Sequence, residues 1–146
     1  MTWQPDDSFL DPDNNGKMKG VNKVKTHLAN HGKELGHIYT SQDADIDTIR
    51  KELENAKAAP GFKQFQLPVV LGPNQDVLAF MTVADPGAVV PSHAHKVDVF
   101  RLIVSGTAYY KRQALTAGDW MVVPAGESYS LTAANNPGYV SYHLYW

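Results

Sequence analysis

Short apolar runs separated by turn residues fill the chain from Phe62 onward, and this pattern restricts the fold more than any other feature of the sequence. The clearest runs cover 77–83, 99–104, 120–123 and 139–146, and each is bounded by glycine, proline or asparagine. Strands of this length and spacing are typical of an all-β barrel or sandwich. The segment 61–146 therefore predicts one β-barrel.

Two different segments precede the predicted barrel. Residues 1–16 are polar and rich in turn residues, which favours an arm that is disordered or lies over a neighbouring subunit. Residues 17–60 predict a helical extension, with helices over 17–35 and 43–59. Their apolar side chains recur at helical spacing: Val21, Val24 and Leu28, then Ile46, Ile49, Leu53 and Ala56. Such narrow stripes require burial on a sheet or on another subunit.

Composition excludes several classes of function. The chain has 146 residues, enough for one hydrophobic core, and a formal net charge of -2 that offers nothing to nucleic acid or an anionic membrane. It contains no cysteine, which excludes disulfides and thiolate catalysis. It has neither a secretory leader pattern nor the roughly 20 apolar residues of a membrane span. We expect a cytoplasmic protein whose partner is a small molecule.

Two motifs within the barrel segment carry the chemistry. In the first, five residues separate Gly87 from His93-Ala94-His95, and the motif ends at Gly106. Histidines two apart on a strand point to the same face, so both imidazoles can reach one point inside a barrel. The second runs from Gly118 through Pro124-Ala125-Gly126 to Tyr129.

Together these motifs resemble the two sequence motifs of the cupin superfamily. The resemblance implies a cupin double-stranded β-helix, a jelly-roll barrel, here with an N-terminal helical extension. It also implies a metal bound by two histidines, a glutamate and a third histidine. In this chain Val99 stands at the glutamate position and Tyr129 at the position of the third histidine.

Two imidazoles alone leave a divalent ion with too few ligands. Asp98 lies one residue before the glutamate position, and a bulge would turn it inward. The phenol of Tyr129 is a second candidate, as metal ligand or hydrogen-bond donor. His143 is a weaker candidate, because strand alternation after a simple hairpin at 135–138 directs it away from Tyr129.

Arg101 is expected on the inner face of the barrel, because it alternates with Val99 and Ile103. A buried guanidinium is costly unless it meets an anion. The partner is either Asp98 or Asp119, or the carboxylate, sulfonate or phosphate of a ligand. Asp98, Arg101 and Tyr129 together resemble a subset of cupins of largely unassigned function.

The other aromatic and histidine residues have simpler explanations. Among the aromatic side chains Tyr110 is assigned to substrate contact, and the others to packing: Tyr109, Trp120, Tyr142 and Trp146. The spacing of His27, His31 and His37 resembles a zinc-protease signature, but Leu28 replaces the catalytic glutamate. These three histidines are predicted to lie on a helix surface.

The leading hypothesis is a cupin-type enzyme acting on a small anionic, carboxylate-like substrate. His93 and His95 hold a divalent ion (Fe, Zn, Mn or Ni), Arg101, Tyr129 and Tyr110 bind the substrate, and Tyr129 and Asp98 are the catalytic candidates. The resemblance implies dioxygenase, decarboxylase, isomerase or lyase chemistry without choosing among them.

Two alternatives remain open. One is a metal-free cupin module that binds or senses a small acid, and the other is a structural or regulatory subunit that uses its N-terminal helices. We also expect a homodimer, covered by the polar arm and the helix over 43–59.

Overall fold

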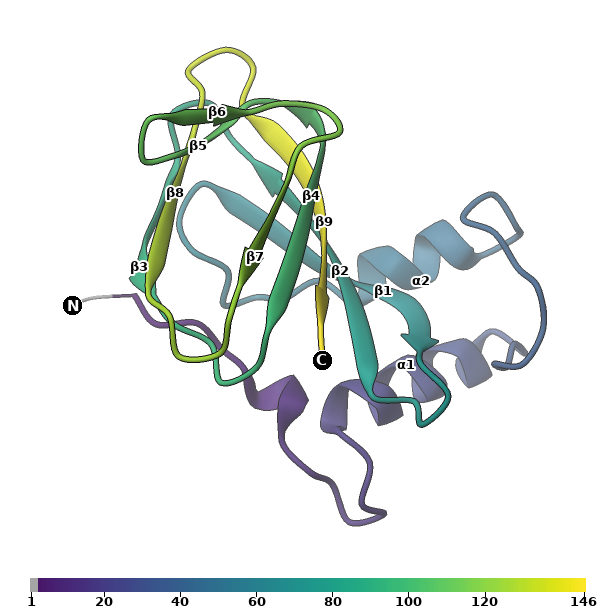
Figure 1. Cartoon of the computed structure of the whole chain (residues 1–146). Coiled ribbons are helices and arrows are strands. Elements are labelled where there is room, and N and C mark those ends of the chain that lie inside the picture. Colours follow the sequence, from purple (N-terminus) through teal and green to yellow (C-terminus); the bar gives the residue numbers. More distant parts are fainter. Residues whose placement is uncertain (1–2) are drawn as a thin grey trace.

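The chain forms two antiparallel sheets that face each other, with helices on the outer side of one of them (Figure 1). The structure, a computed structural model, describes residues 3–146. In this part of the chain the helices are η1 (Ser8–Leu10), α1 (Lys19–Asn30) and α2 (Ile46–Glu52). The strands are β1 (Phe62–Leu71), β2 (Val77–Ala84), β3 (Val89–His93), β4 (Val99–Gly106), β5 (Ala108–Tyr110), β6 (Gln113–Leu115), β7 (Trp120–Val123), β8 (Tyr129–Ala133) and β9 (Tyr139–Tyr145).

The strand order confirms the expected jelly roll with a helical N-terminus. One sheet has the order β1-β2-β9-β4-β7 and the other β3-β8-β5-β6. The consecutive strands β8 and β9 thus belong to different sheets, and β9 lies in the middle of its sheet, between β2 and β4. The sequence runs predicted as strands correspond to β2, β4, β7 and β9, because alternating apolar residues need a buried face.

The first motif ends in glycine for a steric reason. Gly106 has a φ of 71°, and a Cβ atom there would collide with the carbonyl group of Gly138. The end of β4 therefore passes directly against the turn before β9, an approach that only glycine permits.

The helices cover the β1 side of the larger sheet. α1 buries Val21, Val24 and Leu28, as the spacing predicted. α2 is shorter than the predicted helix over 43–59, because the backbone after it pairs with β1. The N–H of Asn55 donates to the carbonyl of Gln64 at 2.7 Å, and this ladder replaces the last helical turns.

Residues 3–16 of the N-terminal arm pack on their own barrel rather than standing free of it, and residues 1–2, which the prediction also covered, lie outside the described part. The ring of Phe9 lies 4.6 Å from that of Phe80 and 5.1 Å from that of Tyr145, between centroids. Lys96 forms an ion pair with Asp11 at 2.6 Å. The arm, purple in Figure 1, passes the end of β3 before it reaches η1. Among residues 3–146, none of the helices has the length and apolarity needed to cross a membrane.

Candidate functional site

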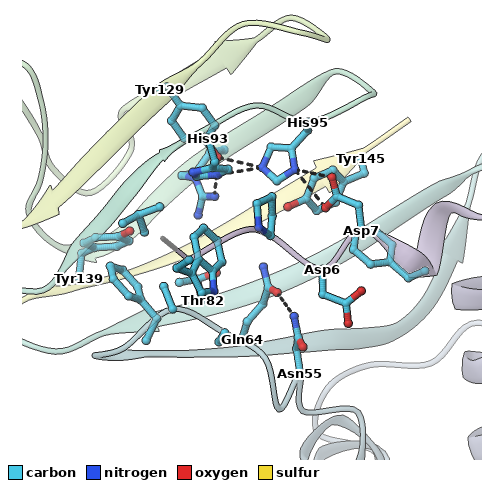
Figure 2. A pocket seen from close by; sticks show the side chains of 18 residues that line it. Asp6, Asp7, Asn55, Gln64, Thr82, His93, His95, Tyr129, Tyr139 and Tyr145 are labelled. Carbon is cyan, nitrogen blue, oxygen red and sulfur yellow. Dashed lines mark hydrogen bonds and ion pairs between the residues drawn. The ribbon is translucent and has the colours of Figure 1, made fainter. Parts of the chain in front are cut away.

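A cavity lies between the two sheets, and the N-terminal arm forms part of its wall (Figure 2). Its volume, taken as the room for the centres of water-sized molecules, is about 50 Å³. The polar side chains that line it come from β1, β2, β3, β4, β8, β9 and the arm. A site assembled from this many elements is specified by the fold rather than by one motif.

His93 and His95 converge in this cavity. His93 ends β3, where it pairs with Tyr129 of β8, and His95 follows in the loop. Both are buried, and their Nε2 atoms lie 3.1 Å apart. Nδ1 of His93 lies 2.8 Å from the carbonyl of Pro91, and Nδ1 of His95 lies 3.1 Å from the carboxylate of Asp7. Carbonyl and carboxylate oxygens only accept, so each Nδ1 carries the hydrogen and donates.

This arrangement directs two Nε2 lone pairs at each other, and a shared cation would stabilise it. A proton is disfavoured on His93, because burial lowers the pKa of this imidazole and the positive charge of Arg101 lowers it further. A metal ion bound to both nitrogens at about 2.0–2.1 Å would hold them roughly 3 Å apart. The spacing of the two rings therefore fits a divalent ion.

Arg101 lies fully inside the barrel, as its alternation with Val99 predicted, and is 6 % exposed. One Nη donates to the Oγ of Ser141 at 2.9 Å and to Nδ1 of His143 at 3.4 Å. The other Nη lies 3.5 Å from the hydroxyl of Tyr129. Its Nε has no hydrogen-bond partner among the described residues, and neither has the buried hydroxyl of Tyr139.

Arg101 also forms no salt bridge within residues 3–146. Neither acid suggested from the sequence reaches it. Asp119 accepts from the backbone and hydroxyl of Thr116 instead. Buried polar groups in folded proteins are nearly always hydrogen-bonded, and buried cations are paired. A bound ligand would best explain two unsatisfied donors of this cavity, the Nε of Arg101 and the hydroxyl of Tyr139.

His143 is part of the same group. It is 1 % exposed, and its ring stacks on Phe80 with centroids 5.4 Å apart. Burial and the charge of Arg101 hold the pKa of His143 well below its usual value. The imidazole is therefore neutral and accepts a hydrogen bond from the guanidinium.

A sequence model of the ChrR cupin-like domain matches residues 44–146. The chain belongs to this cupin family. In the search of curated proteins, none matches. The barrel is thus a cupin barrel, and His93 and His95 both lie within the matched residues.

Several solved cupin structures share the fold. KdgF from Halomonas sp. is 22% identical, with 75% of this chain and 92% of that chain covered and a TM-score of 0.53. An RmlC-like cupin from Shewanella frigidimarina is also 22% identical, with 75% and 89% covered and a TM-score of 0.53. The complex of Rhodobacter sphaeroides SigE with the anti-sigma ChrR gives 13% identity, 88% and 78% coverage and a TM-score of 0.54. At such identities the similarity shows the fold.

The cupin cavity brings together four of the residues singled out from the sequence: His93, His95, Arg101 and Tyr129. The hydroxyl of Tyr129 lies 3.3 Å from Nε2 of His95. Tyr129 thus faces the same part of the cavity as the two histidines (Figure 2).

Asp98 and Tyr110 do not reach the cavity, so their predicted positions are wrong. Val99 pairs with both β7 and β9 without a bulge, and this register turns Asp98 outward, where its carboxylate accepts from the N–H of Ala125 at 2.9 Å. Tyr110 packs against the apolar core and lines a separate hollow, with the ammonium of Lys111 over its ring.

The inward position of His143 also corrects the prediction. The prediction assumed a simple hairpin at 135–138, but this turn joins strands of different sheets, so alternation does not carry over from Tyr129. The residues of β9 that face inward are Tyr139, Ser141, His143 and Tyr145. The alternation of a serine and a histidine with tyrosines in the last strand could have indicated a polar inner face. The sequence around Asp7 contains no comparable signal that this residue reaches the cavity.

The neutral state of His143 predicts a pH dependence of stability. The pKa of His143 is lower in the folded than in the unfolded chain, so the unfolded state binds the extra proton. Stability should fall as pH drops below about 6.5, with His143 contributing up to about 1.4 kcal/mol per pH unit. Urea unfolding at pH 7.5, 6.5 and 5.5 should show a shallower loss for His143→Gln. His37→Gln, at an exposed histidine, should keep the wild-type slope, and equal slopes for all three proteins would contradict this account.

Proposed function

We propose that the cavity binds a small carboxylate-like anion against Arg101, and that His93 and His95 hold a divalent metal ion beside it. The chain then acts as a cupin-type small-molecule enzyme. The observation that carries the proposal is the buried guanidinium, which lacks a carboxylate partner in the described chain and has an unsatisfied Nε.

Energetics supports an anionic ligand at this point. Burying an unpaired cation costs several kcal/mol, and a hydroxyl group offsets only part of that cost. The free N–H of Arg101 and the free O–H of Tyr139 are both donors, whereas a carboxylate is purely an acceptor. Guanidinium and carboxylate also match in shape, because both are planar and present two parallel groups.

The donor set fits a metal with open coordination positions. Among residues 3–146, no group of three or more histidine, cysteine, aspartate or glutamate side chains could hold a metal. The oxygen of Tyr129, 3.3 Å from Nε2 of His95, would be the third protein donor, with the remaining positions left to the ligand. Iron, zinc, manganese and nickel all accept imidazole and oxygen donors. Such an ion supplies a Lewis acid that polarises an oxygen of the bound molecule.

Tyr129 is the candidate acid or base of the reaction. Its hydroxyl lies 3.5 Å from an Nη of Arg101 and 3.3 Å from Nε2 of His95, so it is within reach of both parts of the site. A phenol in this position can hold or give a proton to an anion bound against the guanidinium.

A metal-free module that holds a small acid is the second candidate. The replacement of two metal-ligand positions by Val99 and Tyr129 favours it. In that case Arg101 and Tyr139 keep the same role.

Metal content separates the two candidates. We expect about one equivalent of a divalent metal in the purified protein by elemental analysis, and its loss in a His93→Ala/His95→Ala variant. His27→Ala/His31→Ala removes two histidines that lie outside the cavity, four positions apart, and should retain the metal. No metal in the wild type, together with equal heat stability before and after metal addition, would favour the metal-free module.

Substitution of Arg101 tests the anion site. Small mono- and dicarboxylates should raise the melting temperature of the wild type. Arg101→Met should bind the best of them roughly 10- to 100-fold more weakly, the worth of a hydrogen bond to a charged group. Arg112→Met, at an exposed arginine, is the matched control and should bind as the wild type does. Equal calorimetric affinities in all three proteins would exclude Arg101 as the anchor.

We also infer a homodimer, formed by a surface different from the predicted one. The arm and α2 pack on their own barrel and are not free to cover a partner. By contrast, the outer face of β7, β4 and β9 exposes large apolar side chains: Trp120 60%, Val122 50%, Trp146 48%, Tyr142 39% and Val104 37%. The outward positions of these strands include no charged residue. A flat apolar face of this kind is complementary to a second copy of itself about a twofold axis.

A charge on this face should separate the subunits. We expect a dimeric mass for the wild type in light scattering at tens of micromolar, and a monomeric mass for Val122→Lys. Val89→Lys is the matched control, because Val89 is 51% exposed but lies on the other sheet. A monomeric wild type would refute the dimer, and dissociation by Val89→Lys would refute this choice of face.

A further inference from the structure

Asp7 joins the N-terminal arm to the histidine pair. Its two carboxylate oxygens lie 3.1 and 3.2 Å from Nδ1 of His95, across 88 positions of the sequence. The side chains are 16% and 5% exposed, so the pair is largely screened from water. Figure 2 shows the carboxylate on the side of the His95 ring that faces away from His93.

Aromatic residues anchor the arm on both sides of Asp7. The indole N–H of Trp3 donates to the carbonyl of Lys57 at 3.1 Å, and its ring meets the ring of His93 edge-on, with centroids 5.2 Å apart. On the other side Phe9 packs against Phe80 and Tyr145. The carboxylate is therefore held in place rather than left at the end of a mobile segment.

The neighbouring acid Asp6 has a different role. Its carboxylate accepts from the N–H of Ser8 at 3.1 Å and lies 3.8 Å from the ammonium of Lys57. It contacts neither histidine. The arm thus presents two adjacent acids, and only one of them is directed at the site.

We propose that Asp7 is a positioning residue that fixes the tautomer and orientation of His95, so that Nε2 offers its lone pair to the shared ion. The proposal rests on the proposed metal-binding function. It also explains how the site works without an acid at position 99: the arm supplies a carboxylate from outside the barrel, on the far nitrogen of the ring. Carboxylates that orient a ligand histidine commonly change metal affinity by 10- to 100-fold.

The physical argument concerns which nitrogen carries the hydrogen. With Asp7 present, Nδ1 of His95 donates to the carboxylate and Nε2 is free. Without Asp7, the ring is stabilised by moving its hydrogen to Nε2, where the lone pair of His93 lies 3.1 Å away and accepts it. The two rings then bond to each other, and a metal must break that bond before it binds.

Nitrogen-15 NMR of the histidine rings at pH 8, without added metal, tests this directly. The wild type should show His95 as the Nδ1–H tautomer, with its signals assigned by comparison with His95→Gln. Asp7→Ala should show the Nε2–H tautomer. Asp7→Asn should keep the wild-type tautomer, because the amide oxygen can still accept from Nδ1 of His95. This conservative variant separates the loss of the acceptor from a general loss of folding. Asp6→Ala should not change the signals of His95.

Zinc affinity, measured by calorimetry on the same proteins, completes the test. Asp7→Ala should bind Zn²⁺ at least tenfold more weakly than the wild type, while Asp6→Ala should bind it equally well. An unchanged tautomer or an unchanged affinity in Asp7→Ala would overturn the positioning role. If the wild type binds no zinc, the proposed metal function fails, and the tautomer alone then decides whether Asp7 orients His95.

Discussion

The pairing of β4 with β9 in the centre of the larger sheet determines the character of this cavity. In that register Arg101 lies directly opposite His143, so a guanidinium and a neutral imidazole share the inside of the barrel. The cost of burying that charge makes the other polar groups necessary: a serine, a tyrosine hydroxyl and an acceptor nitrogen surround it. These groups leave the Nε of Arg101 without a hydrogen-bond partner among the described residues, and a bound ligand best explains this free N–H.

Tyr129 connects the two groups of polar side chains in the cavity. Its hydroxyl lies 3.5 Å from an Nη of Arg101 and 3.3 Å from Nε2 of His95. A guanidinium and two imidazoles therefore share one cavity with a phenol within reach of both.

The sequence was sufficient for the parts of the site that depend on local periodicity. His93 and His95, two apart at the end of a strand, and Arg101, alternating with Val99, were placed inward correctly because strand geometry alone decides this. His143 and Asp98 were misplaced because their orientation depends on which strands are neighbours, and one sequence does not reveal that. Asp7 could not be found at all, since its contact joins segments 88 positions apart.

The family match begins at residue 44, after the segment that carries Trp3, Asp7 and Phe9. The match therefore covers the barrel but not the arm that forms part of the cavity wall. Substitutions among the first ten residues would change the polarity and the opening of the cavity without altering any residue of the barrel.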